Sequence, residues 1–506
     1  MLAALFAASV LLSPASPPDS AYREALDLLY DGSTDTALTE LARLAETYPH
    51  DPLADYFQAL ALSWKIEQRP DSTPLDRDLH RRLDAILEST DRRLRTHPED
   101  TRARLARGGA FGLRSRFHLF RLKGREAARA AQAMRAELAQ IGAAAVEAHD
   151  AAFGLGLYDY YVDVLPRVAK LFRFLSGMPG GDRARGLAAI EEARAHATFH
   201  SVEATWQLYE IHAYYEEKPD EALTAIKSLH DQYAGAPLWA LKLTEHLRER
   251  LGRYGEAAAV AREVLTAAER GEPNYGPVAA AHGRVALGEA LLLDLRLAEA
   301  RRVLLWFRGG FDESPHLAAQ ARLLLGRTLE LEGDREAALV HYRAAAASAE
   351  KDVRLDGERA LRRPIAEARV KATPLLAEAR RFREGGRRAE SVAAYRAVLA
   401  AWPDSAEARL RVAEDELRGG ERRAAEEHLA ALDDADEPAP PWVRPWSRLL
   451  RGYVCDLDGQ REDAVQLYKQ VLAAPYGDEV LARAARTRLR QPFRRDAPAR
   501  DERRTP

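Results

Sequence analysis

A residue spacing that occurs twice between Ala281 and Ala345 constrains the fold of this chain more than any other feature. In each copy a glycine is followed by an alanine twelve positions on, and larger residues follow after four and three more. In a helical hairpin these positions lie where the two helices cross and where the next hairpin packs, so a small residue permits close approach. The spacing therefore predicts two consecutive helical hairpins, whose marker residues are Gly288, Ala300, Leu304 and Phe307, then Gly326, Ala338, Tyr342 and Ala345.

Most of the remaining chain repeats this spacing, although Glu210 and Glu245 replace the small residue in two copies. Further copies begin at Ala25, Glu210, Glu245, Ala379, Ala413 and Gly452. The pattern resembles the tetratricopeptide repeat family. The resemblance implies an all-α solenoid of tetratricopeptide-like helical hairpins, in two or more arrays, that offers a binding surface to a protein or peptide.

A Gly-rich aromatic stretch from Phe153 to Leu187 stands apart from the repeats. It contains Phe-Gly-Leu-Gly-Leu-Tyr-Asp-Tyr-Tyr, then Val164-Leu165-Pro166, then Gly177-Met178-Pro179-Gly180-Gly181-Asp182-Arg183. This stretch resembles a signature of the tetratricopeptide repeat 39 and inclusion-body-clearance group. Members of that group are similar to non-enzymatic interaction proteins, which implies the same role here and names neither partner nor compartment.

Composition limits the functional classes. The chain has 506 residues, 47% of them apolar, and a formal net charge of −3. Near-neutral charge argues against a dedicated nucleic-acid binder, because such proteins gain affinity by neutralising phosphates. The single cysteine, Cys455, excludes a disulfide framework within one chain and a zinc site built from cysteines. The excess of Arg over Lys and the many alanines suggest a bacterial origin.

The N-terminal residues favour export. Leu2 to Leu12 is an uncharged apolar run that ends before Ser13-Pro14-Ala15, as in a secretory signal peptide with a small-residue cleavage site. No Lys or Arg precedes the run and no cysteine follows it, so lipoprotein processing is not supported. We expect a periplasmic or secreted protein of the bacterial cell envelope, with a cytoplasmic location as the alternative.

Breaks in the helical pattern divide the chain into segments. A charged stretch from Glu350 to Arg363 interrupts the repeats and predicts an extended helix that joins two arrays. The predicted segments are a signal peptide (1–18), N-terminal hairpins (19–150), the aromatic Gly-rich segment (151–200), a central array (201–348), a charged joint (349–373), a C-terminal array with a cap (374–490) and a disordered tail (491–506).

Candidate catalytic groups are sparse. Glu192, His196 and His200 are four apart and would share one face of a continuous helix, as metal ligands do. A zinc protease needs Glu directly after the first His, which is absent here, so we interpret these histidines as surface or interface residues. His149-Asp150 resembles a base with its orienting group, but lacks a nucleophile, and Cys455 lacks an activating His. We therefore predict no enzymatic activity and no cofactor.

Two functional hypotheses remain open, beside a less favoured third one of a metal-dependent enzyme that rests on His196 and His200 alone. In the first, a protein or peptide binds the groove formed by the first helices of successive hairpins. Proposed contact residues are Trp206, Tyr209, Arg322 and Arg409, although Trp206 and Tyr209 fit core positions equally well. In the second, the protein contacts a membrane surface through Phe111 to Arg125 or Tyr158 to Phe174, which mix aromatic and basic residues.

One recognition mode of the repeat family is disfavoured. Repeats that clamp the C-terminal carboxylate of a chaperone use paired Asn and Lys, and this chain has a single asparagine, Asn274. Arginine can replace the charge of that clamp but not its amide.

Overall fold

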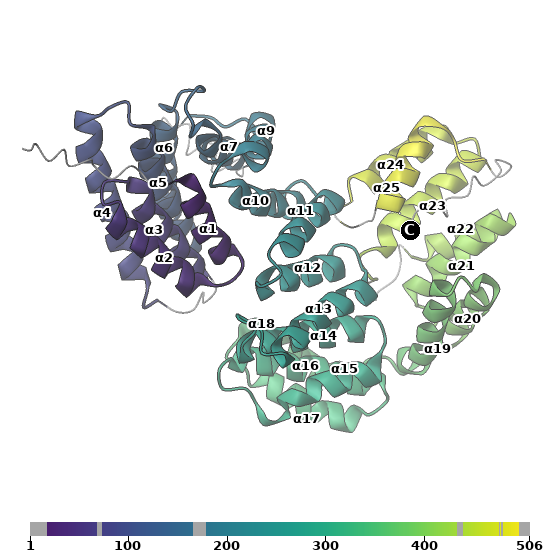
Figure 1. Ribbon diagram of the computed structural model, residues 1–506. Helices are drawn as coiled ribbons and strands as arrows, with labels where there is room; N and C mark the ends of the chain where they lie inside the picture. Colours follow the sequence, from purple (N-terminus) through teal and green to yellow (C-terminus); the bar gives the residue numbers. More distant parts are fainter. Residues whose placement is uncertain are drawn as a thin grey trace, which may run out of the picture. The chain divides into compact units, whose positions relative to one another are not determined.

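A computed structural model describes residues 18–67, 73–164, 179–432, 439–474, 476 and 479–494. Within these ranges all regular secondary structure is helical, with no β-strand, which confirms the all-α prediction (Figure 1). The predicted signal peptide lies outside the described residues, apart from Pro18. The chain separates into two compact units, 1–208 with 231–236, and 209–230 with 237–506.

The first unit contains the N-terminal hairpins. Asp31 and Gly32 form the turn of its first hairpin, and Gly124 begins the second arm of a later one. Its helices are α1 (Asp19–Tyr30), α2 (Thr34–Thr47), α3 (Pro52–Glu67), α4 (Asp76–Thr96), α5 (Thr101–Phe120), α6 (Gly124–Leu138), α7 (Ala148–Val164) and α9 (Arg183–His196). Most of α10 (Ser201–Tyr214) also belongs to it.

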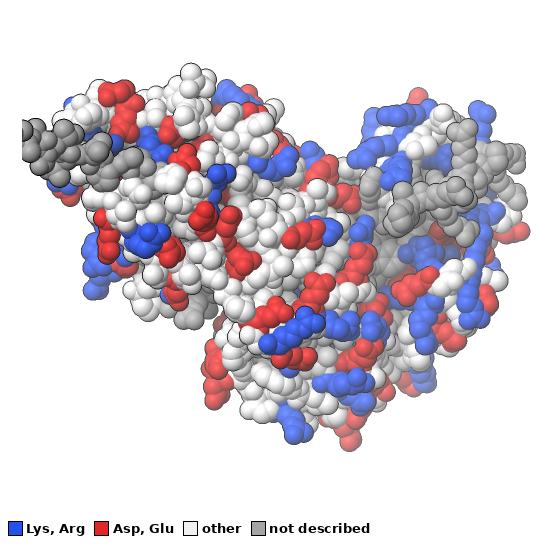
Figure 2. Space-filling view, viewed as in Figure 1, with Lys and Arg blue, Asp and Glu red and all other residues white. Residues whose placement is uncertain are grey.

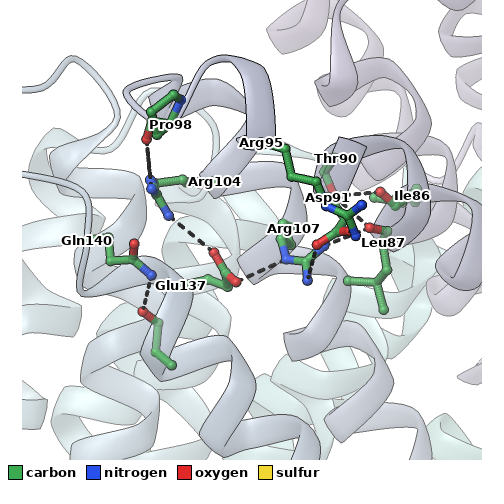
Figure 3. Close-up of polar contacts among 11 residues, drawn as sticks. Ile86, Leu87, Thr90, Asp91, Arg95, Pro98, Arg104, Arg107, Glu137 and Gln140 are labelled. Atoms are coloured by element: carbon green, nitrogen blue, oxygen red, sulfur yellow. Dashed lines mark hydrogen bonds and ion pairs between the residues drawn. The ribbon is translucent and has the colours of Figure 1, made fainter. Parts of the chain in front are cut away.

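Helix α5 is held between its neighbours by arginines. Arg104 and Arg107 both contact the Glu137 carboxylate of α6, and Arg107 also donates to the Leu87 carbonyl of α4 at 2.7 Å (Figure 3). Both side chains are largely buried. Through these arginines α5 is connected to both α4 and α6.

The second unit contains the regular repeats. Its helices are α11 (Pro219–Gln232), α12 (Pro237–Glu249), α13 (Tyr254–Glu269), α14 (Pro277–Leu293), α15 (Leu297–Leu304) with the 3₁₀ turn η1 (Leu305–Gly309), α16 (Pro315–Leu331), α17 (Arg335–Ala346), α18 (Lys351–Arg362), α19 (Glu367–Glu384), α20 (Arg388–Ala401), α21 (Ala406–Gly419), α22 (Arg422–Ala430), α23 (Val443–Leu457), α24 (Arg461–Leu472) and α25 (Glu479–Arg490).

The marker residues lie at the helix crossings, as the spacing predicts. Ala300 and Ala338 are fully buried. A Cβ atom built on Gly288 would lie 2.5 Å from the Leu304 side chain, and one on Gly326 would lie 2.6 Å from the Tyr342 ring. Contacts that short are not tolerated, so glycine is what lets the two helices of each hairpin approach.

A polar arrangement, here called the acid–arginine–tyrosine lock, closes the central array. Glu330, near the end of α16, accepts hydrogen bonds from Arg335 Nη1 at 2.7 Å and from the Tyr342 hydroxyl at 2.7 Å. It also accepts one from the backbone N–H of Ile365 at 2.9 Å. Arg335 in turn donates to the carbonyls of Ala360 and Leu361, the last turn of α18. The lock thus fastens α18 over the α16–α17 hairpin.

The same lock recurs at the C-terminal array. Asp456, Arg461 and Tyr468 take the places of Glu330, Arg335 and Tyr342, with Arg461 at 2.9 Å and the Tyr468 hydroxyl at 2.7 Å from the carboxylate. The backbone N–H of Phe493 is the third donor, at 2.7 Å, and Arg461 donates to the last carbonyls of α25. Helices α18 and α25 are therefore equivalent third helices, each placed over the end of a hairpin.

Two predicted segments border the locks. The charged stretch predicted as a helical joint forms α18, which packs on α17 so closely that a Cβ on Gly357 would lie 2.6 Å from the backbone nitrogen of Ala346. Within the predicted tail, 491–506, Phe493 stacks on Tyr453 with ring centroids 4.1 Å apart. Residues 495–506 lie outside the described part of the chain.

Candidate functional site

Helix α19 of the second unit borders four hollows. The largest, about 1260 Å³, lies between α19 and the ends of α14 and α16. A second, of about 740 Å³, is here called the inner groove, and two smaller ones of about 490 and 300 Å³ lie toward α21 and α23. Arg380 lines three of the four, so the site is best described outward from this side chain.

Arg380 is the central fixed point of the site. Its Nη2 and Nε donate to the Glu407 carboxylate of α21 at 2.6 and 3.0 Å, and its Nη1 donates to the Leu293 carbonyl of α14 at 2.7 Å. The Tyr395 hydroxyl also donates to Glu407, at 3.2 Å. Burial disfavours the charged form of both side chains, but the opposite charge of the partner outweighs burial in each case. The pKa of Arg380 is therefore raised and the pKa of Glu407 is lowered. Arg380 therefore joins three helices as a bidentate ion pair.

The inner groove is lined by first helices of hairpins, the surface that the sequence hypothesis favoured. Helices α14, α16 and α19 contribute, with α18 and the turn before α21. Its charges are mostly matched, since Arg327 and Arg359 both bind Asp356 at 2.8 Å. Arg369 lies over the Trp402 ring, 5.4 Å from its centroid. Its apolar and small lining residues are Leu292, Leu324, Ile365, Ala366 and Leu376.

The hollow of about 300 Å³, here called the arginine hollow, is charged differently. Glu414 of α21 is contacted by three arginines, and Asp415 by two more. The arginine cluster comprises Arg383, Arg411 and Arg418 around Glu414, and Arg388 and Arg396 around Asp415. Five guanidinium groups thus share two carboxylates. In Figure 2, Lys and Arg side chains gather over the part of the second unit that contains these helices.

Arg411 is the buried member of the cluster. Its guanidinium lies 4.7 Å from the Trp442 ring centroid, and a Cβ on Gly252 would lie 2.5 Å from the same ring, so the indole is fixed on both sides. Nη1 donates to Glu414 at 3.2 Å. Nε is buried and has no hydrogen-bond partner among the described residues. Burial and stacking therefore hold this cation in one orientation.

A comparison with the hairpins that form the lock shows how the sequence produces the arginine hollow. Arg383 stands twelve residues before Tyr395, the position that Glu330 and Asp456 occupy before Tyr342 and Tyr468. Because the acid is replaced by a base, this hairpin cannot form the lock, and Tyr395 turns to Glu407 of the following helix. In this repeat, where an arginine stands in place of the acid of the lock, positive charge is concentrated.

The proposed contact residues lie apart from these hollows. Tyr209 is 1% exposed and packs against His246, so it is a core residue. Trp206 is half-buried and packs against Trp64, with ring centroids 6.3 Å apart. Arg322 donates to the Arg308 carbonyl at 2.6 Å, and Arg409 lies 4.0 Å from Asp404. None of the four lines a described hollow, and partner binding by them stays a prediction.

The structure separates the two histidines that were weighed as metal ligands. His196 ends α9 and is exposed, whereas His200 precedes α10 and is buried. His200 Nδ1 lies 2.8 Å from Asp150, and Nε2 lies 2.7 Å from the Tyr56 hydroxyl, so both ring nitrogens are occupied. No continuous helix carries the pair. No group of three or more potential metal ligands occurs in the described ranges.

Asp150 has a structural role. Instead of orienting His149, it accepts backbone hydrogen bonds from Thr198, Phe199 and His200 at 2.9–3.0 Å, together with the His200 contact. Burial raises the pKa of this carboxyl, but the His200 contact and the backbone donors outweigh burial and lower it. His149 lies 3.4 Å from Glu192. Burial raises the pKa of the Cys455 thiol, which disfavours the nucleophilic thiolate.

The basic aromatic helix α5 is largely engaged within the first unit. Arg114 pairs with Asp84, Arg116 with Glu67 and Glu203, and Arg121 with Asp76. The exposed apolar residues are at its end, where Leu119 is 60% and Leu122 is 92% exposed. In the second aromatic segment, Tyr158 and Tyr160 are buried, and residues 165–174 lie outside the described ranges. Among the described helices, none is both long enough and apolar enough to cross a bilayer.

Comparisons with known proteins address the fold. No protein-family model matches the chain, and neither does any curated protein. Solved structures with similar helical arrangements include a tetratricopeptide repeat protein from Parabacteroides merdae ATCC 43184 (14% identity over 57% of this chain and 98% of that one, TM-score 0.25). Another is the Cut9–Hcn1 hetero-tetramer of APC/C, with 11% identity over 94% of this chain and 91% of that one and a TM-score of 0.25. A third is yeast Tom70, with 12% identity over 92% of this chain and 98% of that one and a TM-score of 0.16.

The stacked hairpins, with small residues such as Gly288, Gly326 and Ala338 at their crossings, decide the architecture. The fold is a tetratricopeptide-like α-solenoid. At the identities and TM-scores given, the solved structures say nothing further about this chain. The tetratricopeptide-like solenoid presents its first helices to the inner groove, where a binding surface is to be sought.

Proposed function

We propose that this protein is a non-enzymatic scaffold that binds a segment of a partner protein in the inner groove. The groove itself supports the proposal most directly. It has about 740 Å³ of space between first helices, an apolar floor and charged edges whose ion pairs are already formed within the chain. Such a surface can bury apolar side chains of a guest while its rim stays polar. We also propose that the scaffold works in the bacterial cell envelope, on the basis of the apolar run Leu2 to Leu12.

A position-specific cross-link tests the groove. Ala366 is exposed and lines the groove, and Ala349 is exposed outside all four hollows. With a photoreactive amino acid at position 366 of the full chain in its native host, we expect covalent adducts with a partner protein. The same amino acid at position 349 should give none. Equal adduct patterns at the two positions would contradict the proposal.

A blocking variant sharpens this experiment. Ala366→Trp should fill the groove without removing an internal contact, and should abolish adducts formed from a neighbouring groove position such as Arg363. Ala349→Trp is the matched control and should leave those adducts unchanged. Persistence of the adducts in the Ala366→Trp protein would exclude the groove as the binding surface.

A peripheral membrane contact is the second candidate, and the turn after α5 favours it. Leu122 has a φ of +58°, an unfavourable conformation for leucine, while its side chain is almost fully exposed beside Lys123 and Arg125. An exposed leucine between cations suits an anionic lipid surface. The full chain should then float with phosphatidylglycerol vesicles at low salt, and Leu122→Ser should reduce flotation severalfold. Failure of the unmodified chain to float would end this candidate.

A further inference from the structure

The arginine hollow holds more positive charge than its own carboxylates neutralise. Arg388, Arg396 and Arg418 are each more than half exposed, although each contacts a carboxylate. A guanidinium has five N–H donors, and the contacts described for these side chains use only some of them. The exposed edges of the cluster therefore keep donors directed to solvent, next to a cavity of about 300 Å³.

From this arrangement we propose that the arginine hollow binds a carboxylate-rich segment of the partner protein. The inference rests on the proposed scaffold function and names the chemistry of its partner. Arg383, Arg388 and Arg418 would make the contacts, because they line the hollow and are 42–57% exposed. Arg411 positions them indirectly, since it is fixed by Trp442 and holds the shared Glu414.

The geometry already displays carboxylate recognition. Glu414 accepts from Arg411 and Arg383 at 3.2 and 3.3 Å, and from Arg418 at 2.8 Å. The planar forks of several arginines thus converge on one small anionic group, an arrangement that a guest carboxylate can extend. Burial raises the pKa of Glu414, but Arg383 and the other two arginines outweigh burial and lower it, so the arginines favour an anion at this position.

The surroundings argue against a long polyanion such as a nucleic acid. Further acidic residues lie next to the cluster. Burial raises the pKa of Glu416, Arg396 lowers it, and the charges of Asp415, Glu421 and Glu427 raise it again, so these carboxylates are close together. A continuous phosphate backbone that crossed the hollow would meet these repulsive charges. A short acidic peptide segment can place its carboxylates in the hollow and avoid them.

Binding of defined peptides to the full chain tests the proposal. The probe is a fluorescein-labelled peptide of alternating Glu and Ser, compared by anisotropy at low salt with the corresponding Gln/Ser and Lys/Ser peptides. We expect binding of the Glu/Ser peptide alone, and about tenfold or more weaker binding by R383Q/R388Q/R418Q. The matched control is R302Q/R343Q/R423Q, which removes the same charge from exposed arginines outside the hollow and should change the affinity less than about twofold.

Further outcomes keep the inference separable from folding and from the groove. Because Arg383 and Arg418 support Glu414, the single variant R388Q, which leaves Asp415 its contact with Arg396, serves as a second variant. It should weaken peptide binding severalfold with an unchanged thermal transition. Equal losses in the control triple, or tighter binding of single-stranded DNA than of the Glu/Ser peptide, would overturn the inference. A chain that yields the position-366 adduct but binds no Glu/Ser peptide would refute the hollow alone. The reverse result would refute the groove alone.

Discussion

Replacing Arg380 with methionine is expected to destabilise the α19–α21 region by about 3–5 kcal/mol. The variant leaves Glu407 buried with the Tyr395 hydroxyl as its remaining close donor among the contacts described here, and it also removes the bond to Leu293. An uncompensated buried carboxylate is far costlier than a lost surface pair. Because repeat arrays do not always unfold in one step, hydrogen exchange of the α19 and α21 amides is the appropriate measurement.

Two companion variants define what that result means. Arg381→Met changes the neighbouring exposed arginine and should alter protection by less than about 0.5 kcal/mol. Arg380→Met with Glu407→Leu removes both charges and should recover much of the loss, because no buried charge is then left alone. A single Arg380→Met variant that loses less than about 1 kcal/mol would show that the pair is not the fixed point of the site.

Acidification should destabilise the second unit through His246. This residue is 1% exposed, its Nε2 donates to the Pro219 carbonyl at 2.8 Å, and its Nδ1 is buried with no hydrogen-bond partner among the described residues. Burial, the largest effect, lowers the pKa of His246 from 6.5 to about 4, with Arg250 acting in the same direction. The folded ring therefore has no ready site for a second proton.

The direction of the effect follows from proton uptake. Between pH 6.5 and about 4 the unfolded chain binds a proton at this position and the folded chain does not, so the free energy of unfolding falls as the pH falls. The whole shift in the pKa of His246, from 6.5 to about 4, corresponds to a change of about 3 kcal/mol in the free energy of unfolding. Two less buried histidines of the unit, His282 and His341, also have lowered pKa values and act in the same sense. The measurement is therefore the pH dependence of the free energy of unfolding, compared between the unmodified chain and His246→Gln. The variant should lose the contribution of His246, and identical slopes of stability against pH in the two proteins would contradict the prediction.

The fold was predictable because its determinants are local. The crossing of α16 and α17 depends on Gly326, Ala338 and Tyr342, which lie within seventeen residues, and the structure confirms their roles. The spacing reports which residues must be small, and hairpin geometry follows from that. Even the replacement of an acid by Arg383 can be seen by aligning the hairpins, although its consequence cannot.

The site was not predictable because its contacts join separate repeats. Arg380 and Glu407 are 27 residues apart, and Asp150 and His200 are 50 apart. Adjacency in sequence offered Asp150 as a partner of His149, and periodicity offered His196 and His200 as neighbours on one helix, but neither was the preferred interpretation. The structure differs from both because a helix end intervenes: α9 ends at His196, and His200 contacts Asp150. Which arginines converge depends on how α21 packs beside α19, and no local rule specifies that packing.

The lock at α18 also gives this solenoid a branch point. Since α18 covers the face of α17 on which another hairpin would stack, the chain after Ile365 cannot continue the central array in line. It instead runs as α19 alongside the ends of α14 and α16, where Arg380 fastens it to Leu293. The hollows around α19 thus result from the end of the central array. Because α18 closes that array, the next one begins beside it, and the space between the two arrays is where a partner segment can fit.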